Sequence, residues 1–263
     1  MLFGTHYRVE RNSIALMLGI IIVSGIGGFI EIAPLFTIDD TVEEVSDMRV
    51  YTPLELAGRN IYIREGCYAC HSQMIRTLRD EVDRYGPYSL AVESSYDHPM
   101  LWGSKRTGPD LARIGGKYTD EWQRRHLNNP RELVPQSIMP AYPWLQRTPL
   151  KVRKPAGHLL AMRRVGVPYT DAMLETAAAD LRAQAEPGSA GVAGLIERYG
   201  SGTTVRDFDG NDAVVSEMDA LVAYLQILGR LTSVATEPVA AANQTNQTIS
   251  VQTISEQTSA SEK

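Results

Sequence analysis

Apolar residues are most concentrated near the start of the chain. Residues 12–30, NSIALMLGIIIVSGIGGFI, carry no charge, and the wider segment 12–36 is interrupted only by Glu31. An α-helix needs about 20 apolar residues to cross ~30 Å of hydrocarbon. A cleaved signal peptide is the alternative, but the run is long for one, and no small-x-small cleavage site follows it before the acidic DDTVEEVSD. We therefore predict an uncleaved anchor helix over residues 12–36.

Charges on either side of the anchor predict its orientation. Arg8, Arg11 and the terminal amine precede it, and no Lys or Arg occurs between it and Arg49. The positive-inside rule then places residues 1–11 in the cytoplasm and everything after the anchor on the outer side, which in a bacterium is the periplasm. We expect a single-pass protein of the bacterial inner membrane, with an acidic linker over residues 37–50.

Helix signals recur beyond the linker. Thr52 and Pro53 are a capping residue and a first-turn proline for a helix that runs towards residue 66. One face of this helix carries Leu54, Gly58, Ile61 and Tyr62. Shorter helices are expected in TDEWQRRHLNN and YTDAMLETAAADLRAQA, started by Thr119 and Thr170. Since no segment alternates like a strand for long, the chain is predicted to be mainly α.

The second half ends in a strong helix signal followed by a polar tail. In residues 212–229, an apolar stripe is formed by Val214, Met218, Leu221, Leu225 and Leu228. Gly229 then provides a C-terminal stop. Residues 231–263 are rich in Thr, Ser, Gln and Ala, and we expect them to be disordered because they offer little apolar surface to bury. The folded domain is therefore expected over residues 51–230.

Two further features of composition limit the possible functions. The net charge is −5, and the lysines and arginines look scattered rather than clustered, which argues against a nucleic-acid partner. Residues 79–116 are rich in Gly, Pro, Tyr, Ser and charge, and we expect a long, mostly irregular but ordered excursion.

Both cysteines of the chain, Cys67 and Cys70, lie in the segment GCYACHSQ. A zinc site would need two further ligands, and the histidines that remain, His98, His126 and His158, are not paired at a zinc spacing. A thioredoxin-like pair belongs at a strand-to-helix junction, which a mainly helical chain does not offer.

The residue after the second cysteine favours a third possibility. C-x-x-C-H is the attachment signature of a c-type haem, in which Cys67 and Cys70 form thioethers and His71 is the proximal iron ligand. We predict one covalent haem c, with a structural disulfide as the alternative.

A second axial ligand is expected among the methionines. Met139 lies in the Pro-flanked, non-helical SIMPAYPW and is our choice; Met100 in HPMLWG is the next candidate, and a core methionine is the structural alternative. Met17 lies in the anchor, Met74 is too close to the proximal histidine, and Met218 falls on the stripe of the last helix.

The short motif RTGPDL is also consistent with a haem whose proximal ligand is His71. The carbonyl of Pro109 can accept the Nδ1–H of a proximal imidazole, and Leu111 can cover the ring. Without the cysteine motif, GPDL would indicate only a turn.

Taken together, these motifs resemble the class I cytochrome c fold, whose first and last helices cross at the positions occupied here by Gly58, Tyr62, Leu221 and Tyr224. More narrowly, IYIREGCYACHSQMIR, YDHPMLWGSKRTGPDLARIGGKY and NPRELVPQSIMPAYPWL resemble the membrane-anchored monohaem subunit (subunit II, CcoO or FixO) of cbb3-type cytochrome c oxidases. The similarity spans residues ~12 to ~230. Residues 186–210 look like an insertion before the last helix.

This resemblance implies an electron-relay subunit. Electrons would come from a cytochrome bc1 complex or a soluble cytochrome c through a dihaem cytochrome c subunit. They would leave to the haem b of the catalytic haem–copper oxidase subunit I, where oxygen reduction and proton pumping occur. The excursion at residues 79–116 would dock on that subunit. An anchored subunit of a nitric oxide reductase and a free-standing membrane-tethered shuttle are the alternatives.

Overall fold

The computed structural model describes a helical chain in two compact units, residues 1–44 and 45–263. Described are residues 6–7, 9–38, 42, 45, 47–103, 105–211 and 213–232. Within these residues there is no named β-strand, and Pro149 and Ser216 form one isolated antiparallel bridge. The expectation of a mainly α chain is confirmed.

The first unit contains one long helix. Helix α2 (Ser13–Ile32) begins after Asn12, whose side chain accepts a hydrogen bond from Ala15 N, and continues into the 3-10 helix η1 (Ala33–Phe36). Ser13–Phe36 is the one stretch of the described residues that is long and apolar enough to span a membrane. It matches the predicted range. Arg8, much of the acidic linker and residues 233–263 lie outside the described residues.

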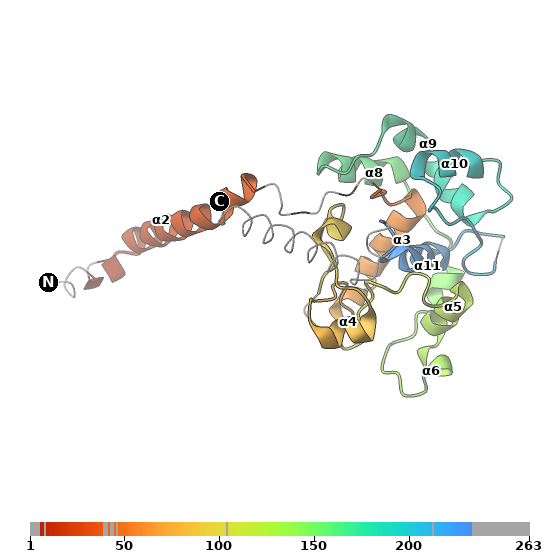
Figure 1. Ribbon diagram of the computed structural model, residues 1–263, viewed down its shortest axis with the longest axis horizontal. Coiled ribbons are helices and arrows are strands. Elements are labelled where there is room, and N and C mark those ends of the chain that lie inside the picture. Colours follow the sequence, from red (N-terminus) through yellow and green to blue (C-terminus); the bar gives the residue numbers. More distant parts are fainter. Residues whose placement is uncertain are drawn as a thin grey trace, which may run out of the picture. The chain divides into compact units, whose positions relative to one another are not determined.

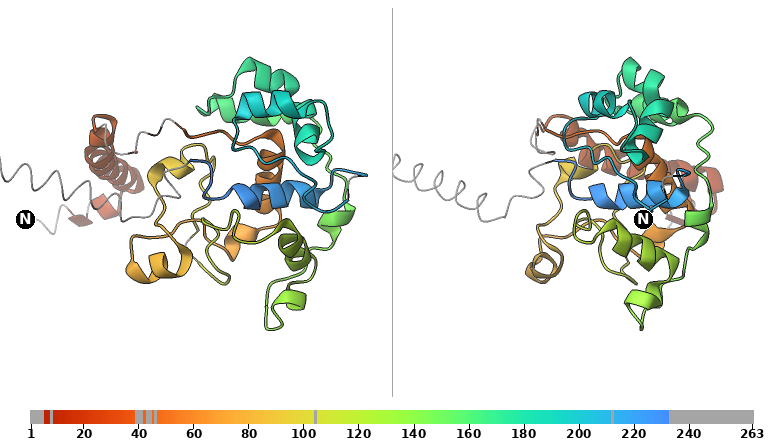
Figure 2. Two further views of the ribbon diagram at one scale, coloured as in Figure 1. Left: turned by 45° about the vertical axis from the view of Figure 1, so that its right-hand side comes forward. Right: turned by 90° about the vertical axis from the view of Figure 1, so that its right-hand side faces the viewer.

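The second unit is built from short helices joined by loops. Its elements are α3 (Pro53–Arg64), η3 (Cys67–Ala69), α4 (Arg79–Tyr85), η4 (Ala91–Ser94), α5 (Asp120–Asn128), α6 (Pro130–Leu133), α7 (Trp144–Arg147), α8 (Pro155–Arg164), α9 (Asp171–Ala185), α10 (Val192–Tyr199) and α11 (Glu217–Ile227). Helices α3 and α11 cross at its centre, with α8, α9 and α10 on one side and α4, α5 and α6 on the other (Figures 1 and 2).

A glycine sets the distance between the two central helices. A Cβ added at Gly58 of α3 would lie 1.9 Å from the carbonyl oxygen of Ala220 and 2.8 Å from the Cβ of Tyr224, both on α11. The rings of Tyr62 and Tyr224 lie 5.6 Å apart beside this contact. The predicted crossing of the first and last helices is therefore present, and it requires the absence of a side chain at one position.

The start of α3 is joined to α9 by buried polar groups. Thr52 and Glu55 form a capping box, as expected for a helix that begins at Pro53. The fully buried side chain of Gln184, on α9, donates to Glu55 Oε1 at 3.1 Å and to the carbonyl oxygen of Thr204 at 3.2 Å. The segment after α9 is therefore held against the central helices by hydrogen bonds.

Two helices of this region lack a clear sequence signal. Helix α10 lies in the segment identified as an insertion and buries Leu195 and Tyr199. Helix α8 begins at Pro155 without a side-chain cap. Neither was predicted, because neither has a Ser, Thr, Asp or Asn at its start, and glycines interrupt both apolar patterns.

The excursion at residues 79–116 is more regular than expected. It contains α4 and η4, and a buried ion pair connects it to α3. Arg59 Nε donates to Asp97 Oδ1 at 3.0 Å, and the hydroxyl of Tyr51 donates to the same oxygen at 3.1 Å. Arg59 also donates to the carbonyl oxygens of His98 and Pro99. Charged side chains, rather than aromatic packing alone, hold the loop in place.

The last helix begins later than predicted. Helix α11 starts at Glu217, and Val214, which was expected on its apolar stripe, is 46% exposed. Ser216 and Asp219 form a capping box that ends the preceding turn. Met218 is fully buried, as expected for a core residue, and Gly229 has a positive φ of 75° that fits its predicted role as a stop.

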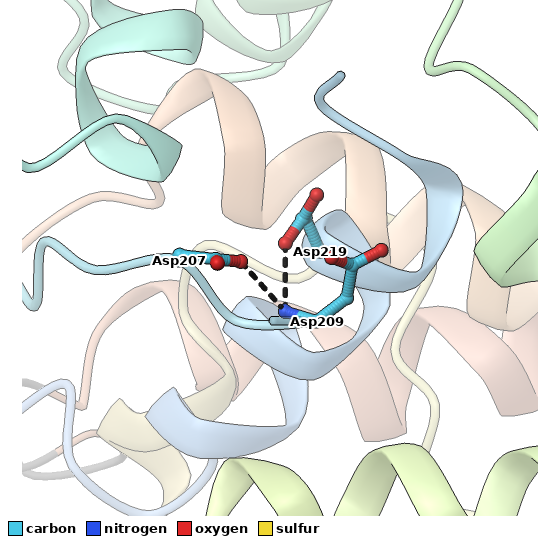
Figure 3. A group of neighbouring side chains, drawn as sticks. All are labelled: Asp207, Asp209 and Asp219. Atoms are coloured by element: carbon cyan, nitrogen blue, oxygen red, sulfur yellow. Dashed lines mark hydrogen bonds between the residues drawn. The ribbon is translucent and has the colours of Figure 1, made fainter. Parts of the chain in front are cut away.

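Three carboxylates gather at this helix start. Figure 3 shows the backbone N–H of Asp209 donating to both Asp207 and Asp219. Asp219 also accepts from the backbone N–H groups of Phe208 and Ser216. Although carboxylate oxygens of the three residues lie within 4.8 Å of one another, they are occupied by these donors. The cluster therefore caps a helix and closes a turn.

The helix crossing predicts a large effect of one methyl group. Gly58→Ala forces the new Cβ against a backbone carbonyl that cannot rotate away, so we expect a loss of about 3 kcal/mol in unfolding free energy. The measurement is chemical denaturation of the purified full chain in detergent. Gly157→Ala on α8 is the matched control, because its Cβ would meet only Lys154 Cβ at 3.5 Å and should leave stability unchanged or slightly higher. Equal stability of the two variants would contradict this account.

The cap of α11 predicts a pH dependence. Burial raises the pKa of Asp219 to about 6, above the value of about 3.9 in an unfolded chain. The carboxyl therefore contributes stability that is fully present below about pH 4 and is lost as the pH rises through about 6. Relative to Asp219→Asn, the wild type should lose on the order of 2 kcal/mol of unfolding free energy between about pH 4 and about pH 7. A difference that does not change with pH would show that this carboxyl titrates normally.

Candidate functional site

The cysteine motif forms a tight turn at the end of α3. Gly66 adopts a positive φ of 73° and starts the 3-10 helix η3. The carbonyl oxygen of Cys67 then accepts from the backbone N–H groups of Cys70, at 3.1 Å, and His71, at 2.9 Å. This turn places two free thiols and an imidazole within one short segment.

The thiols differ from those of a thiol–disulfide catalyst. Burial raises the pKa of the Cys67 thiol to about 12, whereas redox-active C-x-x-C pairs depend on a thiol with a lowered pKa. Cys67 packs against the apolar core, and Cys70 is exposed. The raised pKa of Cys67 is the opposite of what an activated nucleophile requires.

The imidazole of His71 is oriented by the GPDL loop, which lies in the last part of the excursion. Its Nδ1 lies 2.8 Å from the carbonyl oxygen of Pro109. Because a carbonyl only accepts, Nδ1 carries the proton and Nε2 keeps its lone pair for a metal. Two backbone bonds align the segments, from Gly108 N to Cys70 O at 2.9 Å and from Leu111 N to Ser72 O at 2.8 Å. The structure thus brings together five of the predicted site residues: Cys67, Cys70, His71, Pro109 and Leu111.

Gly108 is a site residue that the sequence reading treated only as part of a turn. A Cβ there would lie 2.3 Å from Cε1 and 2.8 Å from Nδ1 of the His71 ring. The imidazole therefore packs flat against the backbone of the loop. The sequence does contain a signal for this role. A glycine directly before the proline that accepts the Nδ1–H bond leaves space for the imidazole ring.

Met139 is placed separately from these five residues. Its side chain is half-buried and packs against the domain core, and its backbone N–H donates to Ser137 Oγ at 3.2 Å. Met100 is 50% exposed, whereas Met218 is fully enclosed by the core. Packing against the core is also what the structural alternative, a core methionine, predicts for Met139. Its ligation of iron stays a prediction.

His126 is a second imidazole near the site. Its ring stacks on Trp122 with centroids 4.6 Å apart, and Trp122 stacks on Tyr118 at 3.9 Å. The buried Nδ1 of His126 has no hydrogen-bond partner in the described part of the chain. Burial disfavours the charged form of His126 and lowers its pKa. A second imidazole, stacked on aromatic rings, therefore lies on α5.

These observations fit a covalently held haem better than zinc. Two unpaired thiols and one imidazole with a free Nε2 lie next to an apolar core, which is the donor set that thioether attachment and axial ligation require. Across the described residues, the only group of three or more His, Cys, Asp or Glu side chains close enough to share an ion is the aspartate cap of α11. The histidines do not complete a zinc site with the cysteines.

Comparison with known proteins assigns the chain to a family. No curated protein matches the chain in a sequence search. The family model described as "Cytochrome C oxidase, mono-heme subunit/FixO" matches residues 6–232, which include the anchor, the CYACH motif, the GPDL loop and the last helix. The chain therefore belongs to the FixO family, the mono-haem subunits of cbb3-type cytochrome c oxidases.

Proposed function

We propose that this chain passes electrons into the catalytic subunit of a cbb3-type oxidase through a single, covalently attached haem c. Membership in the family provides the coarser statement, a mono-haem subunit of an oxidase complex that acts in electron transfer. The observation that carries the finer proposal is the 2.8 Å contact from His71 Nδ1 to Pro109, beside two free thiols. It leaves the imidazole oriented as a proximal ligand should be.

Each site residue has a distinct role in this proposal. Cys67 and Cys70 would hold the haem through thioethers, His71 and Met139 would supply the ligands of its iron, and Leu111 would cover the ring edge. When bound, the haem supplies a one-electron ferric/ferrous couple. The protein's part is to hold the imidazole in one tautomer and to keep apolar side chains around the site.

The route of the electrons follows from the same proposal. A dihaem cytochrome c subunit, supplied by a bc1 complex or a soluble cytochrome c, delivers electrons, and the haem b of the haem–copper subunit I accepts them. The excursion supports docking on that subunit, because Met100 and Trp102 are 50% and 41% exposed on a loop held in place by buried charges. The anchor keeps the domain at the bacterial inner membrane, with the haem on the periplasmic side.

Purification tests this function together with covalent attachment. A tagged chain extracted in mild detergent should bring a multi-helix catalytic subunit with it, and its haem stain should survive denaturing electrophoresis. Reduced haem c in that complex should be reoxidised when oxygen is added. A chain that purifies alone with its haem would instead be a free-standing shuttle. A colourless chain with a Cys67–Cys70 disulfide would end the haem proposal.

The contribution of each thioether to haem attachment can be measured with single and double Cys→Ser variants. In Cys67→Ser or Cys70→Ser, one thioether remains, so we expect a lower yield of attached haem and a changed pyridine haemochrome spectrum in each variant. In the double variant, haem stain should be lost after denaturation. Unchanged stain in the double variant would show that the attachment is not through these thiols.

The identity of the distal ligand has its own test. Met139→Leu should abolish the weak near-infrared charge-transfer band of the oxidised protein, which is characteristic of a methionine on ferric haem. Met100→Leu is the control and should keep the band, because that side chain is exposed on the excursion. The reverse result would assign the ligand to Met100, and a band present in both variants would point to another methionine.

Topology can be measured with reporters. A fusion near residue 230 to an enzyme that is active only in the periplasm should be active, because Arg8 and Arg11 precede the anchor and no Lys or Arg follows it before Arg49. A cytoplasm-only reporter at the same position should be silent. Activity of the second reporter instead would place the haem domain on the cytoplasmic side.

A further inference from the structure

The loop that carries Pro109 is locked to the segment that carries His71 by a buried charge pair. We propose that Asp110 and Arg106 are positioning residues, which hold the Pro109 carbonyl against the His71 imidazole and so set the reduction potential of the haem. This inference rests on the proposed function, since it assigns a regulator of potential within the same site.

Asp110 links the residues that follow the ligand and its acceptor. It comes directly after Pro109, and its fully buried carboxylate accepts at Oδ2 from the hydroxyl of Ser72, the residue directly after His71, at 2.6 Å. The same oxygen accepts from Met74 N at 2.9 Å, and Oδ1 accepts from Ala112 N at 2.8 Å. One side chain therefore fixes the two backbone segments at neighbouring positions.

Arg106, at the start of the RTGPDL motif, also contacts the segment that follows His71. Its Nε donates to Ser72 Oγ at 2.7 Å, and its Nη2 donates to the carbonyl oxygen of Met74 at 2.8 Å. Nη2 also lies 3.4 Å from Asp110 Oδ2, so the guanidinium offsets the buried charge of the aspartate. Both the N–H and the carbonyl of Met74 are thus held by the pair.

Glu81 of α4 is the third charged residue of this network. Its Oε2 accepts from Arg106 Nη2 at 2.8 Å and from Arg76 N at 2.9 Å. The Arg106 guanidinium also lies over the Tyr85 ring, 5.1 Å from its centroid. Helix α4 therefore braces Arg106 from the side away from the imidazole, and the network ends at residues that do not touch the proposed haem ligands.

The network of Arg106, Asp110 and Glu81 acts on the hydrogen bond from His71 Nδ1–H to the Pro109 carbonyl. This bond controls how strongly the imidazole donates to iron. A strong Nδ1–H···O=C bond makes the ring a better donor to ferric iron, which lowers the potential. If the contacts of Arg106 and Asp110 with residues 72–74 are lost, the Pro109 carbonyl moves away from His71 Nδ1. The hydrogen bond then weakens, and the reduction potential of the haem rises. Loss of either charged partner should therefore raise the potential.

A direct electrostatic effect predicts a different pattern. Removing the negative charge of Asp110 would raise the potential of a nearby haem, but removing the positive charge of Arg106 would lower it. The signs of the two shifts therefore separate positioning from simple charge. Arg106→Gln is the informative variant, since the two mechanisms predict opposite shifts for it.

The experiment is spectroelectrochemical titration of haem c in the purified full-length protein. Asp110→Asn and Arg106→Gln should both shift the midpoint potential to more positive values. Glu93→Gln is the matched control, because Glu93 pairs with Arg113 at 2.5 Å in the same excursion. The other hydrogen bonds of this pair go to the backbone of Tyr88, Leu90 and Ala112, not to Ser72 or Met74. Opposite shifts for the two variants, or no shift in either, would overturn the inference.

A second readout covers variants that fold poorly. Ser72→Ala removes only the hydroxyl at the centre of the lock, and it should shift the potential in the same direction by a smaller amount. The His71 Nδ1–H should exchange with solvent on the order of 10-fold faster in Asp110→Asn than in wild type, as expected for a weakened hydrogen bond. An unchanged exchange rate and potential in Ser72→Ala would contradict the proposal. Absence of covalent haem in the wild type would instead refute the proposed function, before any potential is measured.

Discussion

The close approach of α3 to α11 at Gly58 is the constraint on which the rest of the domain depends. A carbonyl oxygen of α11 occupies the space where a side chain of α3 would be, so the two helices have one possible separation. Because α3 ends three residues before Cys67, this contact also fixes where the cysteine turn begins. Helix packing thus places the segment that carries His71, and the GPDL loop then orients its imidazole.

Loops are held around this centre by charged side chains that are shielded from water. Arg59 and Asp97 hold the excursion to α3, and Arg106 and Asp110 hold it to the segment after His71. The excursion buries only some of its large apolar residues, such as Val92, Leu101 and Ile114, and leaves Met100 and Trp102 exposed. Hydrogen bonds from charged groups to backbone carbonyls and N–H groups supply the order instead, and breaking one partner of such a pair is costly because the other remains buried.

The proposed proximal histidine is held in one orientation. The His71 ring lies against Gly108 and donates to the carbonyl of Pro109. A ligand that is fixed in this way suits electron transfer, because its geometry does not have to be rebuilt when the charge of the iron changes. Exposed apolar side chains occur both on the excursion, at Met100 and Trp102, and beside the site residues, at Tyr68 and Ile138.

The sequence by itself determined the features that depend on neighbouring residues. The anchor follows from a continuous apolar run, the starts of α3, α5 and α9 follow from Thr52, Thr119 and Thr170, and the cysteine motif indicates its chemistry through the histidine that follows it. Only the tertiary structure decided that α11 begins at Glu217, that α8 and α10 are helical, and that Arg106 and Asp110 grip Ser72. The contacts to Ser72 join residues 34 and 38 positions apart, and such pairs are selected by which backbone segments the helix crossing brings within hydrogen-bonding distance, a property that no local pattern of residues contains. The start of α11 does have a local signal, the Ser216–Asp219 capping box, and the exposure of Val214 shows that this signal prevailed over the longer apolar stripe.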